Sequence, residues 1–106
     1  MPHDAKDALV GYLKKRAFDP VLNAHADGRP EAEKRRLEDV QRRTREEVER
    51  FERYGSAHEV YVNFKRDLDS TPAKRVHADL KSLGLPTIND IAGDFENEAR
   101  KLGVAH

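Results

Sequence analysis

Apolar residues recur along this chain every three or four positions, which is the spacing of one face of an α-helix. No segment alternates apolar and polar residues over the length of a strand. Prolines stand where several of the patterns begin and glycines where they end, as expected for the first turn and the C-terminal cap of a helix. The sequence therefore predicts an all-α fold. Its main helices are Asp4–Phe18, Pro30–Tyr54, Ala57–Asp69, Pro72–Leu83 and Ile88–Leu102.

The first helix should be followed by a separate short one. Asp19 stands directly before Pro20, and this pair is typical of an N-cap followed by the first residue of a helix. We therefore expect a short helical turn from Pro20 to Asp27, ended by a glycine. The glycines expected to form left-handed caps are Gly28, Gly55, Gly84 and Gly103.

The helix over Pro30–Tyr54 carries the clearest pattern. At about 100° per residue, its apolar positions fall in one narrow stripe, which predicts a single seam of contact with the rest of the bundle. The stripe consists of Leu37, Val40, Thr44, Val48 and Phe51. Most other positions are charged and are spaced for ion pairs worth roughly 0.2–0.5 kcal/mol each. The expected pairs are Glu31/Arg35, Glu38/Arg42, Asp39/Arg43, Glu46/Arg50 and Glu49/Arg53.

Two further N-caps complete the predicted architecture. Ser56 and Glu59 have capping-box spacing at the start of the helix that begins at Ala57, and Thr87 should cap the helix that begins at Ile88. The short connections leave no room for a linker, so residues 1–106 are predicted to form a single domain. We expect a compact bundle of about five helices, with one long ion-paired helix and a C-terminal helical hairpin.

The composition is polar but compatible with folding. Charged residues make up 38% of the 106 residues, and the mean hydropathy is −0.91. Leu, Ile, Val and Phe together number 23, which lies just above the level of about 20% below which chains tend to stay unfolded. The 20 basic residues balance the 20 acidic ones. The chain therefore lacks the basic excess of a dedicated nucleic-acid binder.

Several classes of protein are excluded by what the sequence lacks. Without cysteine there is no disulfide framework and no thiolate nucleophile. Asp4 and Asp7 stand where an export signal needs basic and then apolar residues, so no such signal is predicted. No apolar run approaches the roughly 18 residues that a membrane span requires. We therefore expect a cytoplasmic protein that does not associate with membranes.

Histidine is the main candidate for metal or acid–base chemistry, and its spacing does not favour either. The His-Ala-Asp triplets at 25–27 and 77–79 place each His and Asp on different sides of a helix. His58 opens a segment that resembles a zinc-protease helix, but Val62 stands where the second histidine is required. His77 lies near the apolar face of its helix, which indicates a core or boundary histidine. We therefore predict no metal site and no cofactor.

The sequence does not favour an enzyme. Acid–base catalysis needs two carboxylates in different environments within a cleft, whereas the acidic residues here fall mainly on exposed helix faces. The chain also lacks a glycine-rich phosphate loop and the serine nucleophile motifs. No catalytic residue is therefore assigned.

Nucleic-acid binding is the main alternative function. Six basic residues gather in the long helix, and they would form the binding surface in this interpretation: Lys34, Arg35, Arg36, Arg42, Arg43 and Arg45. The helix Pro30–Tyr54 nevertheless holds eight acids and eight bases, so a phosphate backbone would meet as much repulsion as attraction. The last two helices also make a poor helix-turn-helix, because the second of them is mainly acidic.

By elimination, the sequence favours a small non-enzymatic protein-interaction module that presents a helical face to another protein. The first alternative is an accessory nucleic-acid-binding protein that uses the Arg-rich helix. The second is an enzyme or enzyme subunit whose site is completed by a partner.

Overall fold

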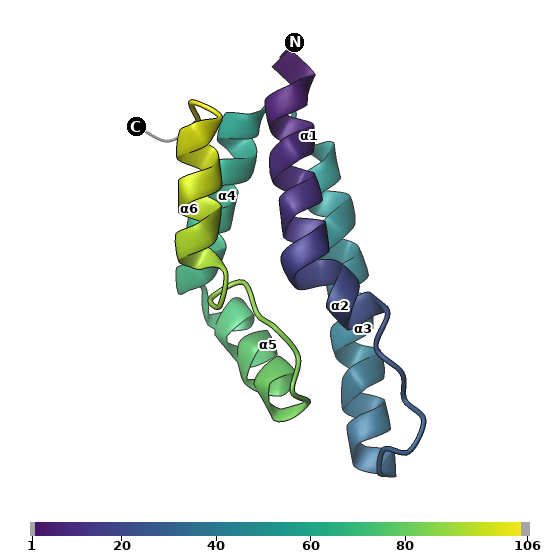
Figure 1. Cartoon of the computed structure of the whole chain (residues 1–106). Helices are drawn as coiled ribbons and strands as arrows, with labels where there is room; N and C mark the ends of the chain where they lie inside the picture. The colour runs from purple at the N-terminus through teal and green to yellow at the C-terminus, as the bar shows by residue number, and fades with distance from the viewer. Residues whose placement is uncertain (1, 105–106) are drawn as a thin grey trace.

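The computed structural model describes residues 2–104, with side chains for residues 5–70 and 74–104. Every regular element in these residues is helical (Figure 1), which confirms the all-α prediction. The first three segments are continuous, so the chain forms five separate helices there. In order, the segments are α1 (Pro2–Leu13), the π-helical η1 (Lys14–Phe18), α2 (Asp19–Leu22), α3 (Glu31–Arg53), α4 (Ala57–Asp69), α5 (Thr71–Ser82) and α6 (Ala92–Lys101).

The break expected at Asp19 is absent, so that prediction was wrong. The backbone of Asp19 is helical, and its N–H donates to the carbonyl of Lys14, five residues earlier. A proline inside an α-helix clashes with the carbonyl four residues before it, and the wider π-helical turn gives Pro20 room within a continuous helix. The same turn adds one residue to the inner face, and both Ala17 and Phe18 are buried.

Helix α3 is the long ion-paired helix that the sequence predicts. Leu37, Val40, Thr44 and Phe51 are buried, and Val48 is half-buried, so the predicted stripe is the packed face. Three expected ion pairs form: Glu31/Arg35 at 3.8 Å, Asp39/Arg43 at 3.1 Å and Glu49/Arg53 at 3.8 Å. The other two do not, because Arg42 pairs with Asp39 and Arg50 pairs with Glu47 and Asp67.

The apolar side chains form two cores along an elongated molecule of 46 × 23 × 19 Å. The larger core joins α1, η1, the C-terminal part of α3, α4 and α6, with Phe51, Phe64 and Phe95 at its centre. The smaller core joins α2, the N-terminal part of α3 and α5. Because α3 contributes side chains to both cores, it connects the two ends of the molecule (Figure 1).

The beginnings of α4 and α6 test the predicted caps. Ser56 Oγ accepts from the N–H of Glu59 at 3.2 Å, as predicted for α4. Thr87 Oγ1 accepts from the N–H of Asp90, but residues 88–91 form successive turns and α6 begins only at Ala92. Thr87 therefore caps the turn before α6, whereas the N-cap of α6 is Ile91, so the prediction that Thr87 caps the last helix was wrong.

The C-terminal pair, α5 and α6, runs in opposite directions (Figure 1). Helix α6 packs on α1 and, through Phe95, on Tyr61 and Phe64 of α4, whereas α5 packs on α3 and α4. Gly84 and Gly103 adopt positive φ angles just after α5 and α6 end, as expected. Gly28 also has a positive φ, but α2 ends at Leu22, so the expected helix to Asp27 was wrong. Gly55 forms no left-handed cap, because Tyr54 before it is already extended. Within residues 2–104, no helix has the length and apolar character needed to cross a bilayer.

Candidate functional site: a cleft between the two cores

A cavity of about 340 Å³ lies where the two cores meet, between α3 on one side and α4, α5 and the segment before α6 on the other. Its volume corresponds to about eleven water molecules at ~30 Å³ each, enough for a long side chain. Its apolar lining comes from Ala17, Phe18, Val21, Val76, Leu80, Pro86 and Ile88. Its polar lining comes from Arg43, Thr44, Glu46, Glu47, Arg50, Asp67, Ser70, His77 and Thr87.

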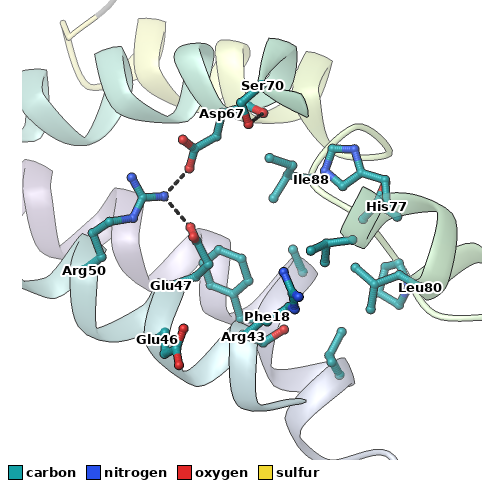
Figure 2. Close-up of a pocket in the computed structure, with 16 residues that line it drawn as sticks. Phe18, Arg43, Glu46, Glu47, Arg50, Asp67, Ser70, His77, Leu80 and Ile88 are labelled. Carbon is teal, nitrogen blue, oxygen red and sulfur yellow. Dashed lines mark hydrogen bonds and ion pairs between the residues drawn. The ribbon is translucent and has the colours of Figure 1, made fainter. Parts of the chain in front are cut away.

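Arg50 organises the charged wall of this cleft. Its guanidinium group lies between the carboxylates of Glu47 and Asp67 and donates a hydrogen bond to each (Figure 2). Glu47 stands one turn earlier on α3, whereas Asp67 comes from α4, so the cluster ties the two helices together at the mouth of the cleft. Arg50 also lies over the Phe51 ring, with its guanidinium carbon 4.9 Å from the ring centroid.

The titration of this cluster reflects its partial burial. Burial raises the pKa of Glu47, although the hydrogen bond and charge of Arg50 act in the opposite direction. Burial also opposes the charge on Arg50, but the hydrogen bonds to Glu47 and Asp67 outweigh it and raise the pKa of Arg50. Because Arg50 engages both carboxylates, neither Glu47 nor Asp67 is placed as an independent general base.

His77 lies on the opposite wall of the cleft and is buried, with 6% of its surface exposed. Its Nδ1 lies 2.6 Å from the side-chain nitrogen of Asn89. Burial lowers the pKa of His77, and the charges of Asp90, Lys81 and Asp67 modify this effect. The sequence prediction of a core or boundary histidine is therefore confirmed, whereas His25 is exposed.

A second hollow, between α1 and α3, is less suited to a ligand. It is lined mainly by polar and charged groups, and the lysines there are already engaged. Lys6 Nζ donates to the carbonyl of Glu52 at 2.7 Å, and Lys14 Nζ pairs with the Glu52 carboxylate at 3.2 Å. The cleft between the two cores is therefore the candidate site.

The six basic residues of the nucleic-acid alternative are spread along α3, and most are engaged within the chain. Arg35 pairs with Glu31, Arg36 donates to Ser82 Oγ at 3.0 Å, and both Arg42 and Arg43 pair with Asp39. Lys34 and Arg45 make no ion pair among the described residues. Of the six, Arg43 is the one that lines the cleft.

The charged cluster of the cleft could not be found from the sequence. Glu47, Arg50, Asp67 and His77 come from three helices, and their spacing along the chain carries no motif. The one sequence feature that could have pointed to this cluster is the position of Arg50 next to the buried stripe residue Phe51. Across the described residues, no three His, Asp or Glu side chains converge in a way that could hold a metal ion.

Comparison of the chain with protein-family models, with curated proteins and with solved structures finds no match. The function must therefore be argued from the geometry of the cleft.

The burial of His77 predicts a pH-dependent stability. The unfolded chain binds a proton near the ordinary histidine pKa of 6.5, whereas the folded chain binds it only at lower pH. The contribution of neutral His77 to the free energy of unfolding should therefore be complete above about pH 6.5 and decrease as the pH drops below that value. Urea unfolding from pH 7.5 to 5 should show this loss, and His77→Gln should reduce it.

The matched control is His25→Gln, because His25 is exposed. Glu47 acts in the opposite sense on acidification, since its pKa is raised, so the difference between each variant and the unmodified chain is the quantity to compare. A His77→Gln variant that loses as much stability on acidification as the unmodified chain would contradict the prediction.

Replacing Arg42 and Arg43 with Gln should have little effect on stability. Both arginines pair with Asp39 at the surface, with exposed side-chain fractions of 62% and 48%, and such pairs contribute about 0.2–1 kcal/mol each. Urea unfolding measures this loss. Binding to a short DNA duplex should be unchanged in the double variant, whereas a salt dependence flattened by about one unit per lost phosphate contact would support the nucleic-acid alternative.

Proposed function

We propose that this chain is a cytoplasmic, non-enzymatic protein-interaction module, and that the cleft between α3 and α5 is where its partner docks. The observation that carries the proposal is the cavity of about 340 Å³ with an apolar floor and a few converging polar groups. A concave apolar site with a few placed polar groups is the usual form of a site that receives a ligand group, and here we propose that the group is a side chain of the partner.

The surroundings of the cleft favour a protein as its occupant. Glu46 and Arg43 are exposed at its edge, and the outer faces of α3 beyond them are charged. An apolar centre surrounded by a polar rim is the arrangement found in protein interfaces. A side chain of the partner would fill the centre and exclude water from it, while its backbone remains on the rim.

A non-enzymatic role agrees with how the polar groups of the cleft are used. Arg50 holds Glu47 and Asp67 together, and the Nδ1 of His77 faces Asn89. These groups hold the walls of the cleft together and are not aimed at a common point where a reacting atom would sit.

The test fills the cleft with a larger side chain. Val76 lines the cleft on α5 and is half-buried against the smaller core, so Val76→Trp should extend into the cavity. Ala78→Trp is the matched control, because Ala78 is exposed on the same helix and does not line the cleft. A tagged chain would capture partners from the native cells, and the captured protein would then be purified for binding measurements.

Val76→Trp should weaken binding of the purified partner at least tenfold, whereas Ala78→Trp should leave it unchanged. Circular dichroism and urea unfolding check that both variants fold. Ile88→Phe, which narrows the cleft from the segment before α6, serves as a second variant if Val76→Trp does not fold. Equal binding by the folded cleft variants and the control would refute the cleft as the docking site.

A further inference from the structure

We propose that the side chain received by the cleft is a lysine or arginine of the partner protein, with its aliphatic stem on the apolar floor and its cation against the acidic wall. This inference rests on the proposed function, since it names the chemistry of the docking residue. Three features carry it: the charges of the wall, the apolar residues of the floor, and the separation of the two.

The wall of the cleft carries more negative charge than its own cations offset. Three carboxylates line the cleft, and Arg50 is shared between two of them, Glu47 and Asp67. The third, Glu46, makes no ion pair among the described residues and is exposed at the edge. Arg43 also lines the cleft and pairs with Asp39, which does not line it and which Arg42 shares. The lining therefore carries three carboxylates against two arginines, both already engaged, so it favours an incoming cation over an incoming anion.

The titration of Glu47 agrees with excess negative charge on this wall. Burial raises the pKa of Glu47 even with Arg50 present, which means that the cluster does not fully compensate the buried carboxylate. A second cation beside Glu47 would stabilise its charged form.

The apolar floor suits the stem of a long side chain. The buried residues Phe18 and Val21 contribute to the floor from η1 and α2. Leu80 and Val76 complete it from α5, and Ile88 completes it from the segment before α6. Lysine and arginine bury their methylene groups along apolar surfaces while their charged ends stay near water or a counterion. A shorter polar side chain would leave much of the floor exposed.

The two kinds of surface are separated in space. Figure 2 shows Arg50, Glu47, Glu46 and Asp67 toward one end of the cleft, and His77 and Leu80 toward the other. His77 is held neutral by burial, since its pKa is lowered, so it does not repel a cation there. A ligand that is apolar at one end and cationic at the other therefore fits this cleft better than one that is apolar throughout.

The test compares probes that differ only at the end of one side chain. Three capped tripeptides, with lysine, norleucine or glutamate between two alanines, are titrated into the ¹⁵N-labelled chain, and dissociation constants are read from backbone amide shifts. The lysine peptide should bind about three to five times more tightly than the norleucine peptide, and the glutamate peptide most weakly. The shifted amides should include residues 44–50, 67 and 77, and the lysine preference should shrink in high salt.

Glu46→Gln isolates the contribution of the acidic wall. It should weaken the lysine peptide about threefold and leave the norleucine peptide unchanged. Glu38→Gln is the matched control, because Glu38 is also exposed and without an ion pair on α3 but does not line the cleft. It should alter neither peptide.

The outcomes separate this inference from the proposed function. Norleucine binding as tightly as lysine, or glutamate binding most tightly, would overturn the cation preference. The effect of Val76→Trp on the native partner would still stand in that case. Absence of any shift at the cleft amides with all three peptides would also overturn the inference. Loss of partner binding in Val76→Trp, observed together with the lysine preference, supports both.

Discussion

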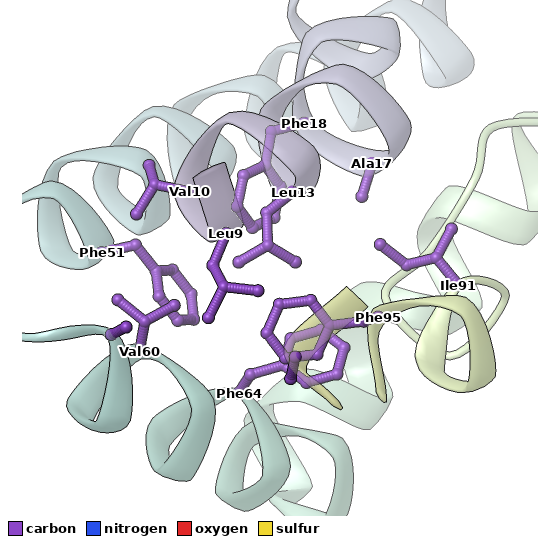
Figure 3. Close-up of a cluster of buried hydrophobic side chains, with 12 residues drawn as sticks. Leu9, Val10, Leu13, Ala17, Phe18, Phe51, Val60, Phe64, Ile91 and Phe95 are labelled. Atoms are coloured by element: carbon purple, nitrogen blue, oxygen red, sulfur yellow. The ribbon is translucent and has the colours of Figure 1, made fainter. Parts of the chain in front are cut away.

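Replacing Phe51 with alanine should lower the free energy of unfolding by about 3–5 kcal/mol, the usual cost of deleting a buried aromatic side chain. Phe51 is 1% exposed and docks α3 onto the larger core. Figure 3 shows it beside Phe18 in this core, with the two ring centroids 6.0 Å apart. The centroid of the Tyr54 ring lies 5.6 Å from that of Phe51. Urea unfolding followed by circular dichroism measures the loss.

The matched control for Phe51→Ala is Val62→Ala. Val62 is 37% exposed on α4, so its truncation should cost within about 0.5 kcal/mol. A Phe51→Ala variant that loses less than about 1 kcal/mol would show that the larger core does not depend on the stripe of α3.

Replacing Leu37 with alanine should cost about 2–5 kcal/mol, because it opens a cavity in the smaller core. Leu37 is 1% exposed and packs with Val21, Leu80 and Leu83. It stands fourteen residues before Phe51 on α3, or about 21 Å at 1.5 Å per residue. The two losses should therefore come from separate contacts.

The shape of the Leu37→Ala transition distinguishes two possibilities. If α3 couples the two cores, as its position in both indicates, the variant should unfold in a single transition at a lower urea concentration. Two transitions, with α5 lost first, would show that the smaller core unfolds on its own. Leu102→Ala is the matched control, because Leu102 is 36% exposed.

The helices of this chain were predictable because local signals agree with tertiary burial along most of it. The stripe from Leu37 to Phe51 is the packed face of α3, and the Ser56 cap begins α4. The continuous first helix was not predictable, because Asp19 and Pro20 carry a local signal for a helix start. The π-helical turn that overrides this signal buries Ala17 and Phe18. The spacing of residues in the sequence does not indicate this burial.

The candidate site was less predictable than the fold. The expected pair of Glu46 and Arg50 is a local prediction on one helix, whereas Arg50 turns toward Glu47 and reaches Asp67 on α4. A partner seventeen residues away in sequence cannot be inferred from helical spacing alone. His77 was placed near the core by its apolar neighbours, but that it lines the same cleft as Arg50 depends on how α5 packs on α3.

The most direct test of the cleft as the docking site is amide hydrogen exchange on the chain alone and on the chain saturated with its purified partner. Docking in the cleft predicts new protection in residues 43–50, 67–70 and 76–88, which surround it. The exposed face of α4 around Val62 should exchange at the same rate in both samples. Protection confined to that face, with the cleft segments unchanged, would contradict docking in the cleft.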